Sequence, residues 1–368
     1  MNQVNAAVAA GTWTGLPELY SWGRNNHGQL GLGNITFYSS PKQVGALTTW
    51  LRLATSSGNI TLATKTDGTL WSWGQNTFGG LGLGNTTYYS SPKQVGALTT
   101  WLTVAAGYFF TLATKTDGTL WSWGENAQGQ LGLGNTTNYS SPKQVGALTT
   151  WLSIAGLFRN TLATKTDGTL WSWGKNDMGQ LGLGNTTYYS SPKQVGSLTT
   201  WSKIAGGNGY TIATKTDGTL WTWGKNNNGQ LGLGNTTYYS SPKQVGILTT
   251  WSKISSALGD QNIVIKTDGT LWSWGLNDHG QLGLGNTTSY SSPKQVGALT
   301  TWSNIAAGSK YAIATKTDGI LWSWGRNSFG QLGLGNITSY SSPKQVGALT
   351  TWLTIASGMY NAITIKTS

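Results

Sequence analysis

The chain has 368 residues, of which 23 are basic and 11 acidic, and its formal net charge is +12. It contains no cysteine, which excludes disulfides, thiolate nucleophiles and cysteine-based metal sites. No run of about 18 apolar residues occurs, so neither a membrane-spanning helix nor membrane insertion is predicted.

The first fifteen residues, MNQVNAAVAAGTWTG, carry no charged side chain ahead of their small-residue stretch. A secretory signal requires positive residues followed by a longer apolar core. We therefore expect residues 1–15 to form an uncharged, flexible arm and residues 16–368 to form one domain. The chain is expected to be cytoplasmic, or to reach a virion or cell surface without a standard signal.

A repeat of 50 or 51 residues runs through the rest of the chain and predicts four strands per unit. In chain order from Trp50, W-x-x-[IL]-A predicts a first strand, T-L-A-T-K a second and T-L-W-S-W a third. P-K-Q-V predicts a fourth, whose proline suits an outer edge. The T-D-G between the second and third strands predicts a type I′ hairpin turn, because Asp-Gly favours positive φ at both central positions.

Seven copies of this unit predict an all-β fold, a seven-bladed β-propeller. The seven tryptophans that precede the glycine of W-S-W-G or its equivalent mark the copies: Trp22, Trp73, Trp123, Trp173, Trp223, Trp274 and Trp324. The chain begins with a third strand that lacks its partner, ELYSWG, and ends with a second strand that lacks its own, NAITIKTS. We expect these two ends to pair in one composite blade, which closes the ring and removes exposed strand edges.

The frame W-x-x-I-A-x-G-x-x-x-T-L-A-T-K-T-D-G-T-L-W-S-W-G-x-N-x-x-G-Q-L-G-x-G, followed by P-K-Q-V, resembles the regulator of chromosome condensation (RCC1) repeat. The resemblance covers about residues 16–368. It implies a seven-bladed propeller with shared closure. It leaves the function open, since members of that family include a nucleotide-exchange factor for a small GTPase, an ultraviolet photoreceptor, parts of ubiquitin ligases and a bacterial β-lactamase inhibitor.

The copies differ from one another at four places. These are the residues between A-x-G and the following T-L, the x positions of G-x-N-x-x-G, the x of T-T-x-Y, and the two residues after Trp50 and its equivalents. All six Phe, all four Arg, both His and both Met other than the initiator fall at these places. Large aromatic side chains and Arg are enriched in the hot spots of binding interfaces.

Alternating strand direction places the first three variable sites on one face of the disc and the T-D-G turns on the other. The fourth variable site is expected on the inner strands, lining the channel. Neutral drift would introduce substitutions into the T-D-G and A-L-T-T segments as readily as into the variable loops. We therefore interpret the variation as a diversified binding surface. The candidate contact residues are Arg24, His27, Phe78, Tyr108, Phe109, Phe110, Phe158, Arg159, Met178, Tyr210, His279, Lys310, Tyr311, Arg326, Phe329 and Tyr360.

The predicted function is a non-enzymatic propeller that binds a macromolecule, a protein or a surface glycan, through this face. Its near-identical blades suit a recently duplicated recognition element, including a bacterial or phage surface component. Two alternatives stay open: binding of a polyanion or nucleic acid through the repeated lysines, and guanine-nucleotide exchange on a small GTPase. The repeated lysines are themselves expected to form a dispersed, solvated ring.

No catalytic residue, cofactor or metal is predicted. The five acids outside the T-D-G turns are scattered over different blades and the two histidines are isolated: Glu18, Glu125, Asp177, Asp260, Asp278, His27 and His279. The loops that match the G-W-R-H-T motif of the photoreceptors carry no tryptophan, so light sensing is not expected either.

Overall fold

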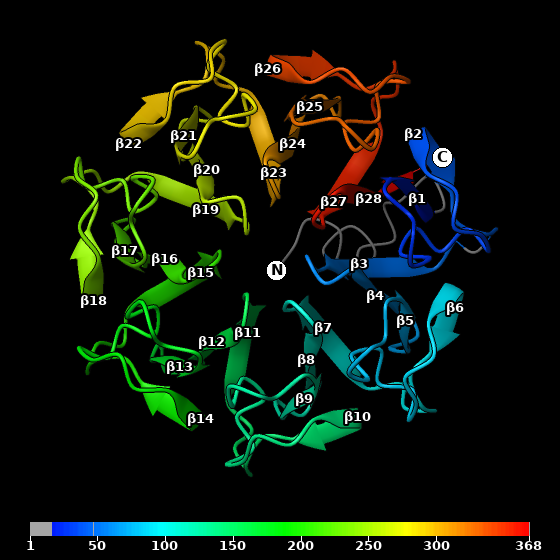
Figure 1. Cartoon of the computed structure of the whole chain (residues 1–368), viewed down its shortest axis with the longest axis vertical. Coiled ribbons are helices and arrows are strands. Elements are labelled where there is room, and N and C mark those ends of the chain that lie inside the picture. Colours follow the sequence, from blue (N-terminus) through cyan, green and yellow to red (C-terminus); the bar gives the residue numbers. More distant parts are fainter. Residues whose placement is uncertain (1–16, 47, 368) are drawn as a thin grey trace.

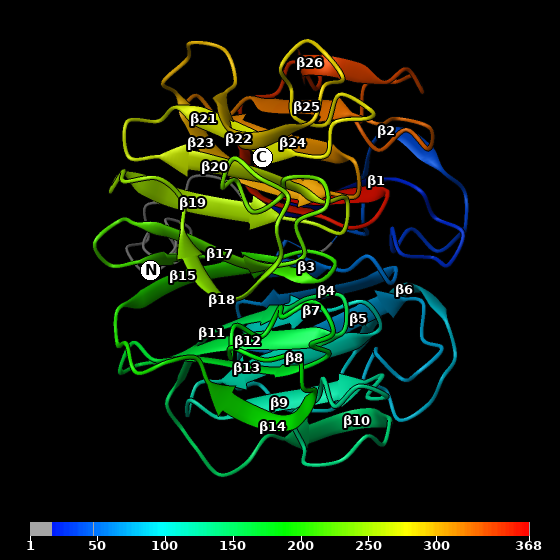
Figure 2. The ribbon, with the colours of Figure 1, turned by 60° about the vertical axis from the view of Figure 1, so that its left-hand side comes forward.

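The computed structural model describes residues 17–46 and 48–367, so the expected arm at residues 1–15 and its boundary with the domain lie outside the described residues. Over those two ranges the chain forms 28 strands in seven four-stranded antiparallel sheets, arranged as blades around a central channel (Figure 1). Figure 2, which shows the disc more from its side, shows strands running between two faces with loops gathered at their ends. The described part of the chain contains no helix long and apolar enough to cross a membrane.

Each blade has the same four strands, from the channel outward. The inner strands are β3 (Trp50–Thr55), β7 (Trp101–Ala106), β11 (Trp151–Gly156), β15 (Trp201–Gly206), β19 (Trp251–Ser256), β23 (Trp302–Gly308) and β27 (Trp352–Ser357). The second strands are β4 (Ile60–Lys65), β8 (Phe110–Lys115), β12 (Asn160–Lys165), β16 (Tyr210–Lys215), β20 (Gln261–Lys266), β24 (Tyr311–Lys316) and β28 (Asn361–Thr367). The third strands are β1 (Pro17–Gly23), β5 (Leu70–Gly74), β9 (Leu120–Gly124), β13 (Leu170–Gly174), β17 (Leu220–Gly224), β21 (Leu271–Gly275) and β25 (Leu321–Gly325). The outer strands are β2 (Tyr38–Gln43), β6 (Tyr89–Gln94), β10 (Tyr139–Gln144), β14 (Tyr189–Gln194), β18 (Tyr239–Gln244), β22 (Tyr290–Gln295) and β26 (Tyr340–Gln345).

The two ends of the described chain share one sheet, which confirms the predicted closure. We number this composite sheet, β27-β28-β1-β2, blade 1, and the sheets that follow it from β3–β6 to β23–β26 blades 2 to 7. Strand β1 pairs antiparallel with β28 along its whole length, from Pro17 opposite Thr367 to Gly23 opposite Asn361 (Figure 1). An ion pair of 3.0 Å between Glu18 and Lys366 spans the same two strands.

A tryptophan joins each blade to the one before it. The indole N–H of Trp73 in blade 2 donates to the carbonyl of Gln29 in blade 1 at 3.0 Å, and the hydroxyl of Thr61 donates to the same carbonyl at 2.8 Å. Trp22 donates to the carbonyl of Gln331 at 2.9 Å, which makes the same joint across the closure. The indole bond is present at all seven blade junctions of the described chain, which explains why this tryptophan never changes, because a buried polar group needs its partner. The threonine is less constant, since Asn262, Ala312 and Ala362 replace it in blades 6, 7 and 1.

The two tryptophans of each W-S-W pack on the tryptophan that starts the inner strand. Trp71 and Trp73 meet Trp50 edge to face, with ring centroids 6.2 and 6.0 Å apart. The ammonium of Lys65 lies 3.8 Å from the ring centre of Trp71 and only 8% of this lysine is exposed. The prediction that the repeated lysines form a solvated ring is therefore wrong for the T-L-A-T-K lysines of blades 2 to 7, because these are stacked on tryptophan. It holds for the P-K-Q lysines, which are exposed, as Lys93 is.

The hairpin between the second and third strands differs from the predicted type I′ turn. Among the described residues only glycines and Asn59, Asp260 and Lys310 have positive φ, so the turn aspartates do not. The amide of Gly68 bonds the carbonyl of Lys65, and Gly68 alone takes the left-handed conformation, at φ +78°. This is a type I turn followed by a bulge. The carboxylate of Asp67 stabilises it by accepting from the amide and the hydroxyl of Thr69.

The fourth strand is the outermost one, as predicted, but its bounds differ from P-K-Q-V. Strand β6 starts at Tyr89 and ends at Gln94, and the buried Val95 lies beyond it. Tyr89 pairs with Gly74 and Lys93 with Ser72, so the strand bulges between these two pairs. Pro92 lies in the bulge, where its missing N–H leaves no ladder bond unmade.

Candidate functional site

The variable loops share one face of the disc. The loops between inner and second strands bond to the loops between third and outer strands: the amide of Glu125 donates to the carbonyl of Phe109 at 3.0 Å, and that of Arg326 to Lys310 at 2.8 Å. We call this side the loop face. On the other side, which we call the framework face, the amide of Trp101 donates to the carbonyl of Gly68 in the T-D-G turn at 3.1 Å. The predicted separation of variable loops from fixed turns is confirmed.

A repeated asparagine holds the longer loop of each blade in place. In blade 3 the side-chain oxygen of Asn126 accepts from the amide of Leu131 at 2.9 Å, and its amide group donates to the carbonyl of Asn135 at 3.0 Å. Asn126 is fully buried. Because the loop backbone is fixed from inside, the variable residues between these anchors can change without changing its path.

Three of the predicted contact residues are core residues, and for them the prediction is wrong. Phe110, Tyr210 and Tyr311 are the first residues of β8, β16 and β24, and none has any exposed surface. The hydroxyl of Tyr210 donates to the carbonyl of Gln261 in the next blade at 3.0 Å. Burial raises the pKa of both tyrosines well above the ordinary value. These side chains enter the space between blades, so they cannot reach a partner.

The other thirteen candidates lie on the loop face and are half-buried: Arg24, His27, Phe78, Tyr108, Phe109, Phe158, Arg159, Met178, His279, Lys310, Arg326, Phe329 and Tyr360. They fall into separate groups rather than one continuous surface.

Four aromatic rings form the first group, which we call the Phe cluster: Phe78, Tyr108, Phe109 and Phe158. Ring centroids are 5.4 Å apart for Phe78 and Phe109 and 4.1 Å apart for Tyr108 and Phe109. Tyr108 and Phe158 are 4.7 Å apart, so the group bridges blades 2, 3 and 4. The guanidinium of Arg159 lies 5.5 Å from the ring centre of Phe158.

The second group consists of charges that pair across blade borders. Arg159 pairs with Glu125 at 3.0 Å, Lys225 with Asp260 at 2.7 Å and Lys310 with Asp278, each joining two neighbouring blades. Lys175 pairs with Asp177 within one loop at 3.0 Å. All four loop-face carboxylates are thus neutralised by a variable lysine or arginine.

Burial acts to raise the pKa of two of these carboxylates, but it prevails only in Glu125. Burial raises the pKa of Glu125, and the charge of Arg159 offsets only part of that rise. Burial also acts to raise the pKa of Asp278, but Lys310, His279 and Gln281 outweigh it and lower the value to about 2.

The histidines of the loop face are separate from each other. His279 contacts Asp278 at 2.9 Å. His27 packs on the ring of Tyr88, and burial followed by the charge of Arg24 lowers its pKa. Over the described ranges no three His, Asp or Glu side chains are grouped so that they could hold a metal ion.

Two arginines and two aromatic rings form the third group, the Arg cluster: Arg24, Arg326, Phe329 and Tyr360. It lies at the border of blades 7 and 1. The guanidinium of Arg24 is 5.2 Å from the ring centre of Phe329, and that of Arg326 is 5.0 Å from the ring centre of Tyr360. Within the described part of the chain, neither arginine has a carboxylate at ion-pair distance, unlike the other cations of this face.

The candidate list missed four exposed aromatic residues of the loop face. Phe37, Tyr88, Tyr188 and Tyr238 occupy the x of T-T-x-Y and are 42–44% exposed, more than any listed candidate. Phe37 extends the Arg cluster, with its ring centroid 5.7 Å from that of Phe329. The sequence did contain a signal for these four residues, because the x of T-T-x-Y was one of the variable sites.

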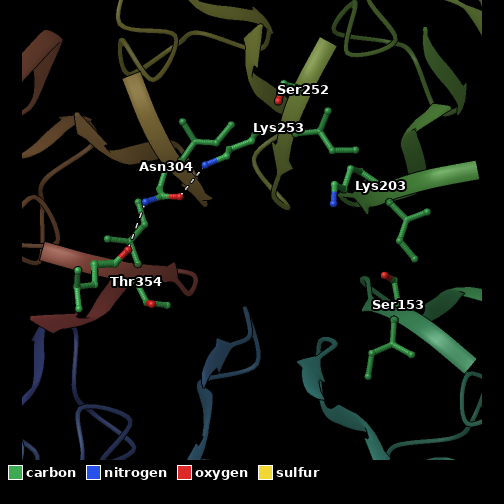
Figure 3. Close-up of a pocket in the computed structure, with 12 residues that line it drawn as sticks. Ser153, Lys203, Ser252, Lys253, Asn304 and Thr354 are labelled. Carbon is green, nitrogen blue, oxygen red and sulfur yellow. Dashed lines mark hydrogen bonds between the residues drawn. The ribbon is translucent and has the colours of Figure 1, made fainter. Parts of the chain in front are cut away.

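The fourth variable site lies in the channel, as predicted. The third residues of the inner strands include Ser153, Lys203, Lys253, Asn304 and Thr354, and these line its main cavity (Figure 3).

Comparison with protein families matches residues 18–302 to the RCC1-like domain, and residues 302–331 and 318–365 to the regulator of chromosome condensation (RCC1) repeat. Curated relatives include the protein RCC2 homolog of Xenopus laevis, 41% identical over 80 residues, which are 21% of this chain and 16% of that protein. The ultraviolet-B receptor UVR8 of Arabidopsis thaliana is 37% identical over 79 residues, 21% of this chain and 18% of the receptor. The alignments therefore span less than a fifth of the length of these relatives.

Solved structures match along nearly the whole chain. Prp20p from Saccharomyces cerevisiae, described with its binding properties to Gsp1p and histones, has a TM-score of 0.86 and 20% identity, covering 96% of this chain and 92% of Prp20p. Human WBSCR16 has a TM-score of 0.85 and 21% identity, covering 96% and 99%. At this identity the likeness shows the shared fold.

Proposed function

This chain belongs to the RCC1 family of propellers, and we propose that it is a non-enzymatic binding protein whose loop face holds an acidic, partly apolar segment of a protein partner. The observation that carries the proposal is the Arg cluster. Arg24 and Arg326 lie against the same two rings, Phe329 and Tyr360, and have no carboxylate partner among the described residues.

The Arg cluster supplies the chemistry that an acidic segment requires. A guanidinium beside a ring can still offer N–H groups to a carboxylate. Arg326 already donates through Nε to the hydroxyl of Ser328 at 2.8 Å and through Nη1 to that of Tyr360 at 3.3 Å, so its other N–H groups would make this contact. The rings hold the guanidinium groups in place, so little side-chain entropy is lost on binding. The neighbouring exposed ring of Phe37 offers apolar contact next to the charge.

Relatives support a protein as the partner class. The solved propeller Prp20p is described by its binding to Gsp1p and histones, and a second yeast structure shows it with Kap60. The two alternatives have less support in this chain. The T-L-A-T-K lysines are packed on tryptophan, so they are not free to contact a polyanion. Nucleotide exchange rests on the family resemblance alone.

Affinity capture from the native source tests the proposal. The double variant Arg24→Gln, Arg326→Gln uses the residue that the repeat itself places at this position in blade 2, Gln75. The matched control Lys93→Gln, Lys143→Gln removes the same charge from exposed outer strands. We expect a protein that the wild type and the control capture to be lost with the arginine variant. Equal capture by all three chains would contradict the loop-face assignment.

A peptide library measures the chemistry of the partner directly. We expect selection on the wild-type chain to enrich segments in which Asp or Glu lies beside Leu, Phe or Tyr. A hot-spot contact is worth about 2 kcal/mol or more, so the arginine variant should bind such peptides at least about 30-fold more weakly. Enrichment of no peptide, together with retention of the chain on a glycan array, would favour a surface glycan instead.

A further inference from the structure

The central channel contains a cavity that the loop-face function does not use. Its volume is about 440 Å³, within the range of about 300–1,000 Å³ that is typical of ligand pockets. The lining comes from five consecutive inner strands, β11, β15, β19, β23 and β27, and consists mainly of their third and fourth residues (Figure 3). Because the inner strands start at the framework face, the cavity lies towards that face.

A second, smaller space lies at the loop end of the channel. Its volume is about 80 Å³, and it is lined by Tyr108, Leu157 and Leu258 among others. The amide of Tyr108 donates to the carbonyl of Leu157 at 3.0 Å, which ties two neighbouring loops together there. The larger cavity thus lies nearer the framework face than this second space does.

Two ammonium groups from neighbouring blades enter this cavity. Lys203 lies on β15 and Lys253 on β19, whereas the equivalent residues of the adjoining blades are the neutral Ser153 and Asn304. Burial first, and the charge of Lys203 second, lower the pKa of Lys253. Both lysines line the same cavity and are exposed to the space of the channel, and none of the residues that line the cavity is acidic.

The surroundings orient one of the lysines and leave the other facing the open space. Lys253 donates to the side-chain oxygen of Asn304 at 3.0 Å and to the carbonyl of Ser303. Asn304 is itself held by bonds to the hydroxyl of Thr315 at 3.2 Å and the carbonyl of Leu353 at 3.3 Å. Figure 3 shows the Lys203 ammonium at the cavity, with Ser153 on the neighbouring strand β11, and no described residue accepts a hydrogen bond from this ammonium.

We propose that this cavity binds a small, multiply charged oxyanion of the phosphate class. Lys203 and Lys253 supply the positive charge, and the hydroxyls of Ser153, Ser252 and Thr354 supply neutral donors around it. Ile204, Ile254 and Ile305 line the cavity between these polar groups, while both ammonium groups stay exposed to the water of the channel, so their attraction for an anion weakens as salt rises. An anion between the two ammonium groups would also remove their mutual repulsion.

Isothermal titration calorimetry with pyrophosphate tests the site in the full-length chain at low salt. We expect one pyrophosphate per chain. The single variants Lys203→Ser and Lys253→Ser should each bind it at least about tenfold more weakly, since each removes a charge-assisted hydrogen bond. Serine is the residue at the same position in blade 4, so the strand should accept it. Lys203→Arg, which keeps the charge, should retain most of the binding.

The control is Lys143→Gln, Lys193→Gln, which removes two exposed cations from the outer strands. We expect this variant to bind pyrophosphate as the wild type does. Absence of binding by the wild type, several weak sites per chain, or an equal loss in the outer-strand variant would overturn the proposal. Thermal unfolding gives an independent measurement. Without anion, the Lys203→Ser chain should melt no lower than the wild type, and pyrophosphate should raise the melting temperature of the wild type and of the outer-strand control more than that of the Lys203→Ser chain.

Discussion

Variable residues of the loop face work in pairs. Glu125 contacts Arg159, Lys225 contacts Asp260 and Arg326 contacts Tyr360, in each case from one blade to the next. The partners lie 34 or 35 residues apart in the chain. Comparison of the copies therefore identified the positions that vary but could not show which of them touch. Part of the variation that the sequence assigns to partner recognition is used inside the protein.

The Glu125→Gln substitution tests the balance within one of these pairs. Because burial raises the pKa of Glu125, its charged form costs stability at neutral pH, and this cost disappears as falling pH protonates the carboxyl. The half-buried Arg159 keeps access to water when its partner is neutral. We expect the variant to be as stable as the wild type or up to about 1 kcal/mol more stable at pH 7, with no difference below about pH 4. Urea unfolding at both pH values measures this, and a clear loss of stability at pH 7 would show that the ion pair is net stabilising.

At the scale of the strand and turn, the order and number of elements follow from the sequence. Short Thr-, Leu- and Trp-rich runs between T-D-G turns predicted all four strands. The turn type did not follow, because Asp-Gly fits both a type I′ turn and a type I turn with a glycine bulge. In the type I turn the Asp67 carboxylate accepts from the amide of Thr69, and the same turn forms in blade 7, where the amide of Ile320 alone donates to Asp318. The predicted ends of the outer strand were also wrong. They depend on the bulge at Pro92, which forms only when this strand pairs with β5.

Two glycines with similar backbone conformation allow the cost of backbone strain to be distinguished from the cost of a steric clash. Gly68 and Gly96 have φ of +78° and +60°, which costs another residue about 1–2 kcal/mol. A Cβ on Gly68 would lie 2.0 Å from the carbonyl oxygen of Thr99, whereas one on Gly96 meets nothing within 4 Å. We expect Gly96→Ala to lower the free energy of unfolding only by the cost of the backbone strain. We expect Gly68→Ala to lower it clearly more. Denaturation midpoints compare them, and equal losses would mean that the turn can move away from Thr99.

At the scale of the molecule, both the blade number and the closure were predictable, because each half hairpin at a chain end supplies what the other lacks. The grouping of the loop face into separate clusters was not, because it depends on which blades become neighbours. The burial of Phe110, Tyr210 and Tyr311 was not predictable either. These residues follow variable loop residues directly in the sequence, and only the start of the strand at that residue turns them inward.

Equivalent leucines test whether the composite blade contributes as much as the others. Leu19 in blade 1 and Leu170 in blade 4 occupy the same place in the third strand, and neither is exposed. Replacing a buried Leu with Ala typically costs about 2–5 kcal/mol. We expect Leu19→Ala and Leu170→Ala to lower the free energy of unfolding by similar amounts in one cooperative transition. A small loss for Leu19→Ala alone would mean that the ring is open at its chain ends.

The bond from a tryptophan indole to the carbonyl at the Gln of G-Q-L has a consequence for how such a chain can change over generations. Every junction uses the same donor and an equivalent backbone acceptor, so a copied or excised unit of whole length presents compatible edges to either neighbour. Gene duplication can thus add or replace blades without inventing a new interface. Contacts specific to particular blades, such as Glu125 with Arg159 on the loop face and Tyr210 with Gln261 between blades 5 and 6, then record which blade belongs beside which.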